Sequence, residues 1–236
     1  MARRLDVGAV LRHVFEIYVE QAPVLMPAAA TVFVFSGLLS ILLSSSGPGL
    51  RLLSLFVSLV AGSIFTGMIV ELVSDVRDGR RDASAGDLVR AVAPVVGRVI
   101  LVGVVAAAGV LLGLLLFVVP GLVLITVWAV SVPVIVLERP PGLGALARSR
   151  ELVGGNGWPV FAVILLLDVF VALLVGAIDY GAETGGTAAG IVVTVVLGVL
   201  SAPIPALGAA VLYFDLGGRR AVASAGPQPE DPFGGP

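Results

Sequence analysis

The sequence has no cysteine, no lysine and a single histidine among its 236 residues. Without cysteine the chain forms no disulfide, and a zinc site of cysteine and histidine is excluded within one chain. Without lysine it has no Schiff-base or phosphate-loop chemistry of the kind that uses a lysine amine. The net charge of −2 lacks the basic excess typical of nucleic-acid binding, so no nucleic-acid partner is expected. We also expect no cofactor.

Charge of either sign is scarce. Charged residues make up 13% of the chain and hydrophobic residues 58%, whereas a soluble domain carries about 25% charged residues. Hydrocarbon is the solvent that suits this composition. The sequence therefore predicts an all-α integral membrane protein with a single membrane domain over residues 1–216. The stretch 217–236 is rich in proline, glycine and alanine, which predicts a disordered cytoplasmic tail.

Six apolar runs approach or exceed the length of about 20 residues that a helix needs to cross hydrocarbon about 30 Å thick. They cover residues 24–45, 52–73, 99–119, 121–137, 158–178 and 187–214. One helix over 99–137 would be close to 60 Å long at about 1.5 Å per residue, so the chain must reverse within this segment. We expect the reversal at Pro120–Gly121, because proline cannot continue a helix and glycine tolerates a sharp turn.

Arginine placement predicts the orientation of these spans. With six spans, one side holds 13 of the 14 arginines and the other side holds only Arg51. The positive-inside rule then places both termini in the cytoplasm. The cytoplasmic arginines are also candidates for contact with anionic lipid head groups.

A short pattern, Gly-x-aliphatic-x-Arg, occurs three times. It covers residues 8–12, 86–90 and 144–148, and a pair of spans follows each copy. Each copy reads as a short amphipathic helix on the cytoplasmic side. We infer three interfacial elbow helices, and three units that each consist of an elbow and a helical hairpin.

Small residues at a spacing of four follow several spans and predict close packing of helices, either within one bundle or between copies of the chain. They are Ser36, Ser40 and Ser44; Ser54, Ser58, Gly62 and Thr66; Gly109 and Gly113; and Gly186, Gly190, Thr194, Gly198 and Ala202.

The second half of the chain carries a recognisable set of residues. They are Pro120-Gly121-Leu122, Trp128, Pro133 to Glu138, Ala145 to Gly154, Trp158, Pro203 and Leu212 to Leu216. Together they resemble the membrane-domain family found fused to glycerophosphoryl diester phosphodiesterases and as free-standing bacterial membrane proteins. The resemblance covers about residues 120–219. It departs at Gly217-Gly218-Arg219, where the family has an arginine directly after the Asp-Leu pair, and this weakens any charge contact of Asp215.

The resemblance implies no catalytic residue for this chain. In the fused proteins catalysis belongs to a separate soluble (β/α)₈ barrel, which needs about 250 residues. Only a tail of some twenty residues follows the sixth span here. We therefore expect a chain that is not an enzyme.

Polar residues near the fourth and fifth spans have two interpretations. Arg148, Ser149, Arg150 and Glu151 either bind lipid head groups or serve topology and local ion pairing, such as Arg148 with Glu151 at i+3. Glu138, at the end of the fourth span, is a further candidate.

Prolines interrupt two spans. Pro133 in the fourth span, and Pro203 and Pro205 in the sixth, free backbone carbonyls, either in simple kinks or in broken helices that line a substrate site.

Asp168 lies in the middle of the fifth span, with Ala172 and Gly176 on the same helical face. We expect this small-residue face to pack against other helices, and Asp168 to point into the bundle and to hydrogen-bond a hydroxyl or a freed carbonyl. Its role is either structural or functional, because intramembrane acids are functional candidates.

The predicted function is a non-enzymatic membrane module, a scaffold or partner for envelope or lipid-handling proteins. The alternative is a small-solute or lipid transporter with kinked helices and a midplane carboxylate, Asp168. An intramembrane hydrolase is the third hypothesis, although no two carboxylates are placed together, because Glu71 lies near the cytoplasmic end of its span.

Overall fold

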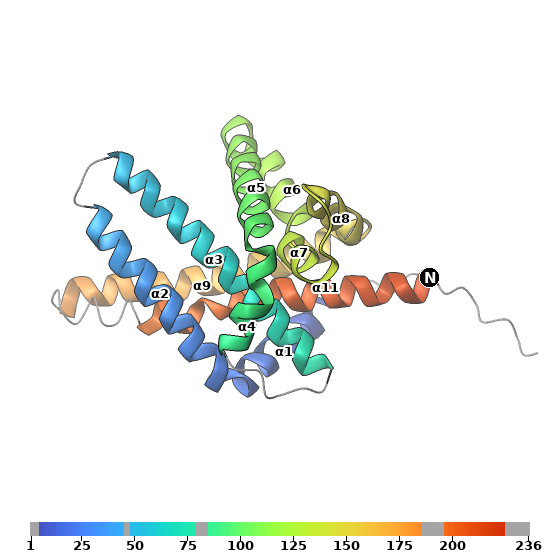
Figure 1. Cartoon of the computed structure of the whole chain (residues 1–236), viewed down its shortest axis with the longest axis horizontal. Helices are drawn as coiled ribbons and strands as arrows, with labels where there is room; N and C mark the ends of the chain where they lie inside the picture. Colours follow the sequence, from blue (N-terminus) through green and yellow to red (C-terminus); the bar gives the residue numbers. More distant parts are fainter. Residues whose placement is uncertain (1–4, 45–47, 79–84, 186–195, 225–236) are drawn as a thin grey trace, which may run out of the picture.

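A computed structural model describes residues 5–44, 48–78, 85–185 and 196–224, and every regular element in these ranges is a helix (Figure 1). The elements are α1 (Val7–Glu20), α2 (Ala22–Ser44), α3 (Pro48–Arg77), α4 (Ala85–Val92), the 3₁₀ helix η1 (Ala93–Val95), α5 (Val96–Leu116), α6 (Val118–Val127), α7 (Ser131–Glu138), α8 (Gly144–Val153), α9 (Gly157–Gly185) and α11 (Pro203–Ser224). Residues 196–201 are also helical.

The helices have the length and composition of membrane spans. Within the described residues, five helices are long and apolar enough to cross a membrane, and a sixth is added if α1 and the start of α2 form one bent span. The all-helical, multi-pass prediction is therefore confirmed at this level.

The three Gly-x-aliphatic-x-Arg segments lie on the short helices α1, α4 and α8. Their aliphatic residues, Val10, Leu88 and Leu146, are all buried. The arginine two positions later turns outward, since Arg12 and Arg90 are exposed. The pattern thus matches a helix with one face in the core and one face outside it.

Helix α1 begins at a side-chain cap and ends at a sharp bend. The Asp6 carboxylate accepts a hydrogen bond from the Ala9 N–H over 3.2 Å, which satisfies one of the free amides of the first turn. After Gln21 the chain continues as α2 at 85° to α1. The buried face of α1 consists of Val10, Val14 and Ile17, and α1 packs against α11 and α9.

Helices α3 and α11 form the centre of the protein. Each packs against the other and against several further helices, including α7. Half of the residues in the span that contains α11 are buried, compared with 11% for the span of α5. Figure 1 shows α2 with the first half of α3, and the α5–α6 pair, projecting away from this centre, whereas the second half of α3 lies within it.

The reversal between the third and fourth spans lies three residues earlier than predicted. Phe117, in extended conformation, separates α5 from α6. Pro120 then falls in the first turn of α6, where its missing N–H would have had no helical acceptor, so the prediction of a break at Pro120–Gly121 is wrong. Gly121 instead allows close contact: a Cβ on Gly113 would lie 3.0 Å from the Gly121 Cα.

Close packing at the glycines of the third span is confirmed within this chain. A Cβ on Gly109 would come within 2.7 Å of the Trp128 ring. The second-span stripe differs, because nothing lies within 4 Å of a Cβ added at Gly62. The side chains of the first-span stripe, and residues 186–195 of the sixth, lie outside the described residues.

The fourth span consists of two helices. A turn at residues 128–130 separates α6 from α7. Pro133 lies in the first turn of α7, where a proline is tolerated, so it marks the start of a helix and not a kink within one.

The last span has the same kind of interruption. Pro203 opens α11 after a turn at Ala202. The helix then runs to Ser224, seven residues past the predicted start of the tail at Gly217. Extending a helix that has already formed costs less than starting a new one, and alanine and arginine are strong helix formers. Residues 225–236 of the predicted tail lie outside the described residues.

Candidate functional site

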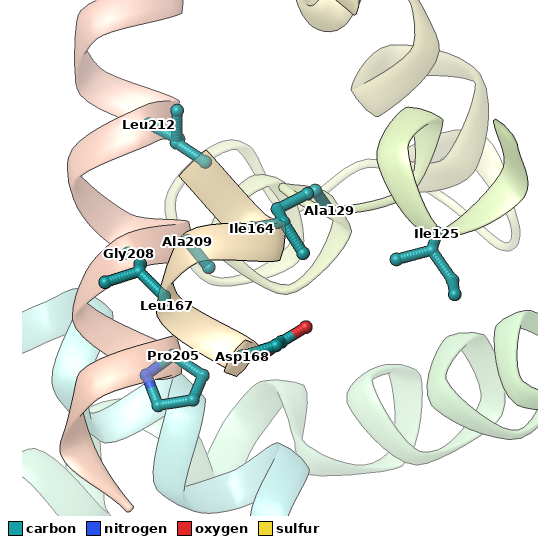
Figure 2. A pocket seen from close by; sticks show the side chains of 9 residues that line it. All are labelled: Ile125, Ala129, Ile164, Leu167, Asp168, Pro205, Gly208, Ala209 and Leu212. Carbon is teal, nitrogen blue, oxygen red and sulfur yellow. The ribbon is translucent and has the colours of Figure 1, made fainter. Parts of the chain in front are cut away.

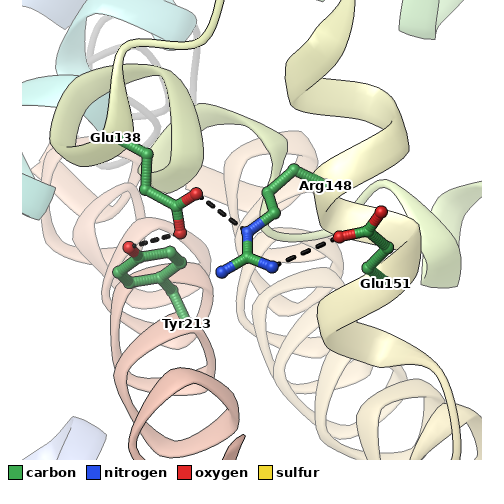
Figure 3. Close-up of polar contacts among 4 residues, drawn as sticks. All are labelled: Glu138, Arg148, Glu151 and Tyr213. Carbon is green, nitrogen blue, oxygen red and sulfur yellow. Dashed lines mark hydrogen bonds and ion pairs between the residues drawn. The ribbon is translucent and has the colours of Figure 1, made fainter. Parts of the chain in front are cut away.

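A hydrogen-bonded cluster joins the end of α7 to α8 and α11 (Figure 3). The Arg148 Nε donates to one carboxylate oxygen of Glu138 over 2.8 Å, and the Tyr213 hydroxyl donates to the other over 2.9 Å. Arg148 also bonds Glu151 over 3.2 Å, so the predicted i+3 ion pair is confirmed. The hydrogen bond with Glu138 is the largest cause that raises the pKa of Arg148 above its ordinary value.

The geometry of this cluster indicates a structural role, which is to hold α7, α8 and α11 together. Glu138 uses both oxygens, one for each of two other helices, and Arg148 donates to two carboxylates. The side chains of Glu138 and Arg148 are 30% and 40% exposed, so solvent screens the pair only in part. A free anion would have to compete with Glu138 and Glu151 for this guanidinium.

Ser149 closes the break in the fourth span. Its side chain is fully buried, and its Oγ donates to the Val127 carbonyl over 2.7 Å. Val127 is the last residue of α6, where a carbonyl has no continuing helix to bond it. Ser149 therefore replaces a missing backbone donor, whereas its neighbour Arg150 is exposed.

Asp215 makes the charge contact that the departure from the family pattern argued against. Its Oδ1 lies 3.4 Å from the Arg77 Nη2, at the end of α3. The Arg77 guanidinium also lies 4.6 Å from the centre of the Phe214 ring, within the range of a cation–π contact. The arginine that pairs with Asp215 thus lies far away in sequence.

A further contact ties the start of α5 to the end of α7. The Arg98 Nη1 donates to the carbonyl of Arg139 over 3.1 Å. Arg139 has the left-handed conformation, with φ 52° and ψ 43°, and ends α7. The left-handed conformation is energetically unfavourable for a residue other than glycine, and the hydrogen bond from Arg98 helps to hold the Arg139 backbone in it.

Asp168 lines a pocket of about 200 Å³ that opens to the protein surface. The other lining residues are Ile125, Ala129, Ile164, Leu167, Pro205, Gly208, Ala209 and Leu212. They come from α6, the turn before α7, α9 and α11. Figure 2 shows the Asp168 side chain pointing away from α11. Among the described residues that line the pocket, Asp168 is the only ionisable one.

The prediction for the face of α9 that carries Asp168 is wrong. Asp168, Ala172 and Gly176 are all exposed, and nothing lies within 4 Å of a Cβ added at Gly176. The buried face consists of Val160, Val163 and Leu167, and Leu167 packs against Gly208 of α11. Larger aliphatic side chains bury more apolar surface than the small residues do, which decides the rotation of the helix.

The predicted hydrogen bond of Asp168 is absent from the described part of the chain. No described hydroxyl, amide or cation contacts its carboxylate. Among the same residues, no group of three or more histidine, aspartate and glutamate side chains is placed to hold a metal ion.

Sequence reasoning missed the residues that connect distant segments. Tyr213 and Arg77 were not singled out, and neither was Tyr18, whose hydroxyl donates to the Leu200 carbonyl over 2.8 Å near the Pro203 turn. A tyrosine or arginine at the end of an apolar run was the one available signal. It shows that a polar tip needs a partner, but it does not say which segment supplies it.

No family model, curated protein or solved structure matches the chain.

Proposed function

We propose that this chain is a non-enzymatic membrane module, a scaffold or partner for envelope or lipid-handling proteins, of the kind that the phosphodiesterase-associated family resemblance implies. The observation that supports it is the use of the charged residues. Glu138, Arg148 and Asp215 are engaged in contacts that hold helices together. Asp168, in the pocket, has no second acid or base beside it among the described lining residues for general acid–base chemistry.

The module has six spans, three cytoplasmic elbow helices and both termini in the cytoplasm of a bacterial plasma membrane. The contacts between helix ends support this topology. They join the end of α3 to α11, the end of α7 to α8 and α11, and the start of α5 to the residue after α7. The arginine distribution assigns all of these ends to the same side.

Single introduced cysteines test the topology, because the chain has none of its own. Cysteines that replace Ser84 and Ser224 should react with an impermeant maleimide only after the membrane is permeabilised. Cysteines that replace Gly47 and Glu183 should react in intact cells. Reaction at position 84 from outside, together with protection at position 183, would invert the topology.

The lack of catalysis is tested with the purified chain. It should not hydrolyse glycerophosphodiesters above a blank with any divalent metal. Activity that follows the protein through purification, and that is lost on replacing Asp168 or Glu71, would contradict the proposal.

Partner binding is tested by photo-crosslinking in living cells. A photoreactive residue in place of the exposed Arg150 should give a discrete adduct to an envelope or lipid-handling protein. The same residue in place of Leu115, which is 71% exposed near the end of α5 on the opposite side, is the matched control. Lipid adducts alone at both positions would contradict a partner protein and favour contact of Arg150 with lipid head groups.

The alternative is transport of a small solute or lipid, and the pocket at Asp168 beside the broken fourth span favours it. Asp168→Asn and Asp168→Leu separate the roles of this residue. Retained stability with lost complementation in the asparagine variant would support transport. A leucine variant that is stable and fully functional would show that Asp168 has no role.

A further inference from the structure

The pocket between α6, α9 and α11 combines one carboxylate with an otherwise apolar lining. Eight of its nine lining residues are apolar, and Asp168 is the ninth. Figure 2 shows the carboxylate among these residues. Because no described group pairs with Asp168, an occupant that supplies a positive charge would meet an acceptor that the protein leaves unused.

One of the apolar lining residues, Ala129, also has an unused backbone acceptor. Ala129 lies in the turn between α6 and α7, and its carbonyl would ordinarily bond the N–H four residues later. That residue is Pro133, which has no N–H. No other described donor bonds the Ala129 carbonyl. Pro133 thus has a chemical consequence: the pocket contains a residue with an unused backbone acceptor as well as the carboxylate.

The size and the opening of the pocket restrict the ligand. A volume of about 200 Å³ is smaller than the roughly 300–1,000 Å³ of sites that enclose a drug-sized molecule. The pocket therefore accommodates a compact polar group and the first part of an apolar body. Because the pocket is open and lies in a candidate span, the rest of that body can extend into lipid.

We propose that this pocket binds a protonated amine carried on an apolar body, with the ammonium group at Asp168. An ammonium has three donors and no acceptor, which matches a site whose unused groups are acceptors. An anion is disfavoured by the carboxylate, and a neutral alcohol leaves its charge uncompensated. The amine is either the head group of a lipid or a free amphiphilic amine.

This site requires no partner protein, so it goes beyond the proposed module and stands or fails separately from the photo-crosslinking result.

The test uses the full chain in nanodiscs of phosphatidylcholine, a lipid whose head group carries no primary amine. Decylamine is the probe, and decanol and decanoate are its neutral and anionic controls, with affinity measured by calorimetry and supported by the melting temperature. The wild-type chain should bind decylamine at least tenfold more tightly than decanol. Asp168→Asn should lose at least tenfold of the decylamine affinity. Equal affinity for decylamine and decanol, or an unchanged affinity in the asparagine variant, would overturn the proposal.

Two further variants keep the test decisive if Asp168→Asn does not fold. Ala209→Leu fills the pocket from α11 without touching the carboxylate, and it should abolish decylamine binding. Ala172→Leu adds the same volume on the exposed surface of α9, outside the lining, and should bind as the wild type does. Undiminished binding in Ala209→Leu would refute the site.

The source of the amine is distinguished by adding phosphatidylethanolamine to the nanodiscs. Competition with decylamine, lost in Asp168→Asn, identifies a lipid head group as the ligand. Decylamine binding that this lipid leaves unchanged identifies a free amine.

Discussion

Glu138 holds α7, α8 and α11 together, and its removal should destabilise the fold more than the loss of any exposed ion pair. In Glu138→Ala, the Arg148 Nε loses a 2.8 Å bond and the Tyr213 hydroxyl loses a 2.9 Å bond. Arg148 keeps Glu151, so its charge is not left entirely without a partner. The Tyr213 hydroxyl donates to no second acceptor among the described residues.

The magnitude follows from the two lost bonds. A hydrogen bond to a charged group contributes about 1.5–3 kcal/mol when it is buried. Since the side chains of Glu138 and Arg148 are 30% and 40% exposed, solvent screening brings their pair toward the about 1 kcal/mol of exposed pairs. Adding the tyrosine bond, we expect Glu138→Ala to cost about 1.5–3 kcal/mol of unfolding free energy.

The measurement is reversible unfolding in mixed micelles, with Glu151→Ala as the matched control. The Glu151 side chain is 62% exposed and bonds the same arginine, so its loss should cost about 0.5 kcal/mol or less. In a double-mutant cycle, Glu138→Ala and Tyr213→Phe should couple by about 0.5–1.5 kcal/mol. An equal cost for Glu138→Ala and Glu151→Ala, or no coupling to Tyr213, would refute the reasoning.

Two further pairs of variants, each a test position and its control, give equally specific expectations in the same unfolding assay. Gly121→Ala should lower the unfolding free energy by about 1–3 kcal/mol, because its Cβ would lie 2.8 Å from the Leu114 backbone nitrogen. Gly176→Ala, with open space around it, should stabilise its helix by about 0.5–1 kcal/mol. Similar effects at both positions would contradict the close packing of α5 and α6. Ser149→Ala should lower the unfolding free energy by about 1–3 kcal/mol, because the Val127 carbonyl loses its donor. The Ser63 hydroxyl bonds only the Leu59 carbonyl within α3, so Ser63→Ala should cost less. The reverse order would argue against the capping role of Ser149.

The sequence was most informative where one local property determines the outcome. Long apolar runs predicted helices of spanning length, and the spacing of Arg148 and Glu151 predicted their ion pair. The reversal was misplaced because proline is tolerated in the first turn of a helix as well as after its end, and Phe117 gave no signal. The orientation of Asp168 was missed because small residues indicate a packing face only when larger aliphatic residues do not compete for burial. Tyr213, Arg77 and Tyr18 were beyond reach because their partners lie on other helices.

The contact between the two ends of the chain has a consequence for the order of assembly. Tyr18 and the Leu200 carbonyl that it bonds are 182 residues apart. At about 5–20 residues per second, roughly ten to forty seconds of translation separate them. Throughout that time α11 is not available to cover Val10, Val14 and Ile17. The apolar face of the nascent α1 therefore lacks part of its final cover during this time, and the lipid interface or an insertion factor must shield what α9 does not. A ribosome that stalls before the last helix leaves the first one only partly covered, and such a truncated chain is a natural substrate for membrane proteolysis.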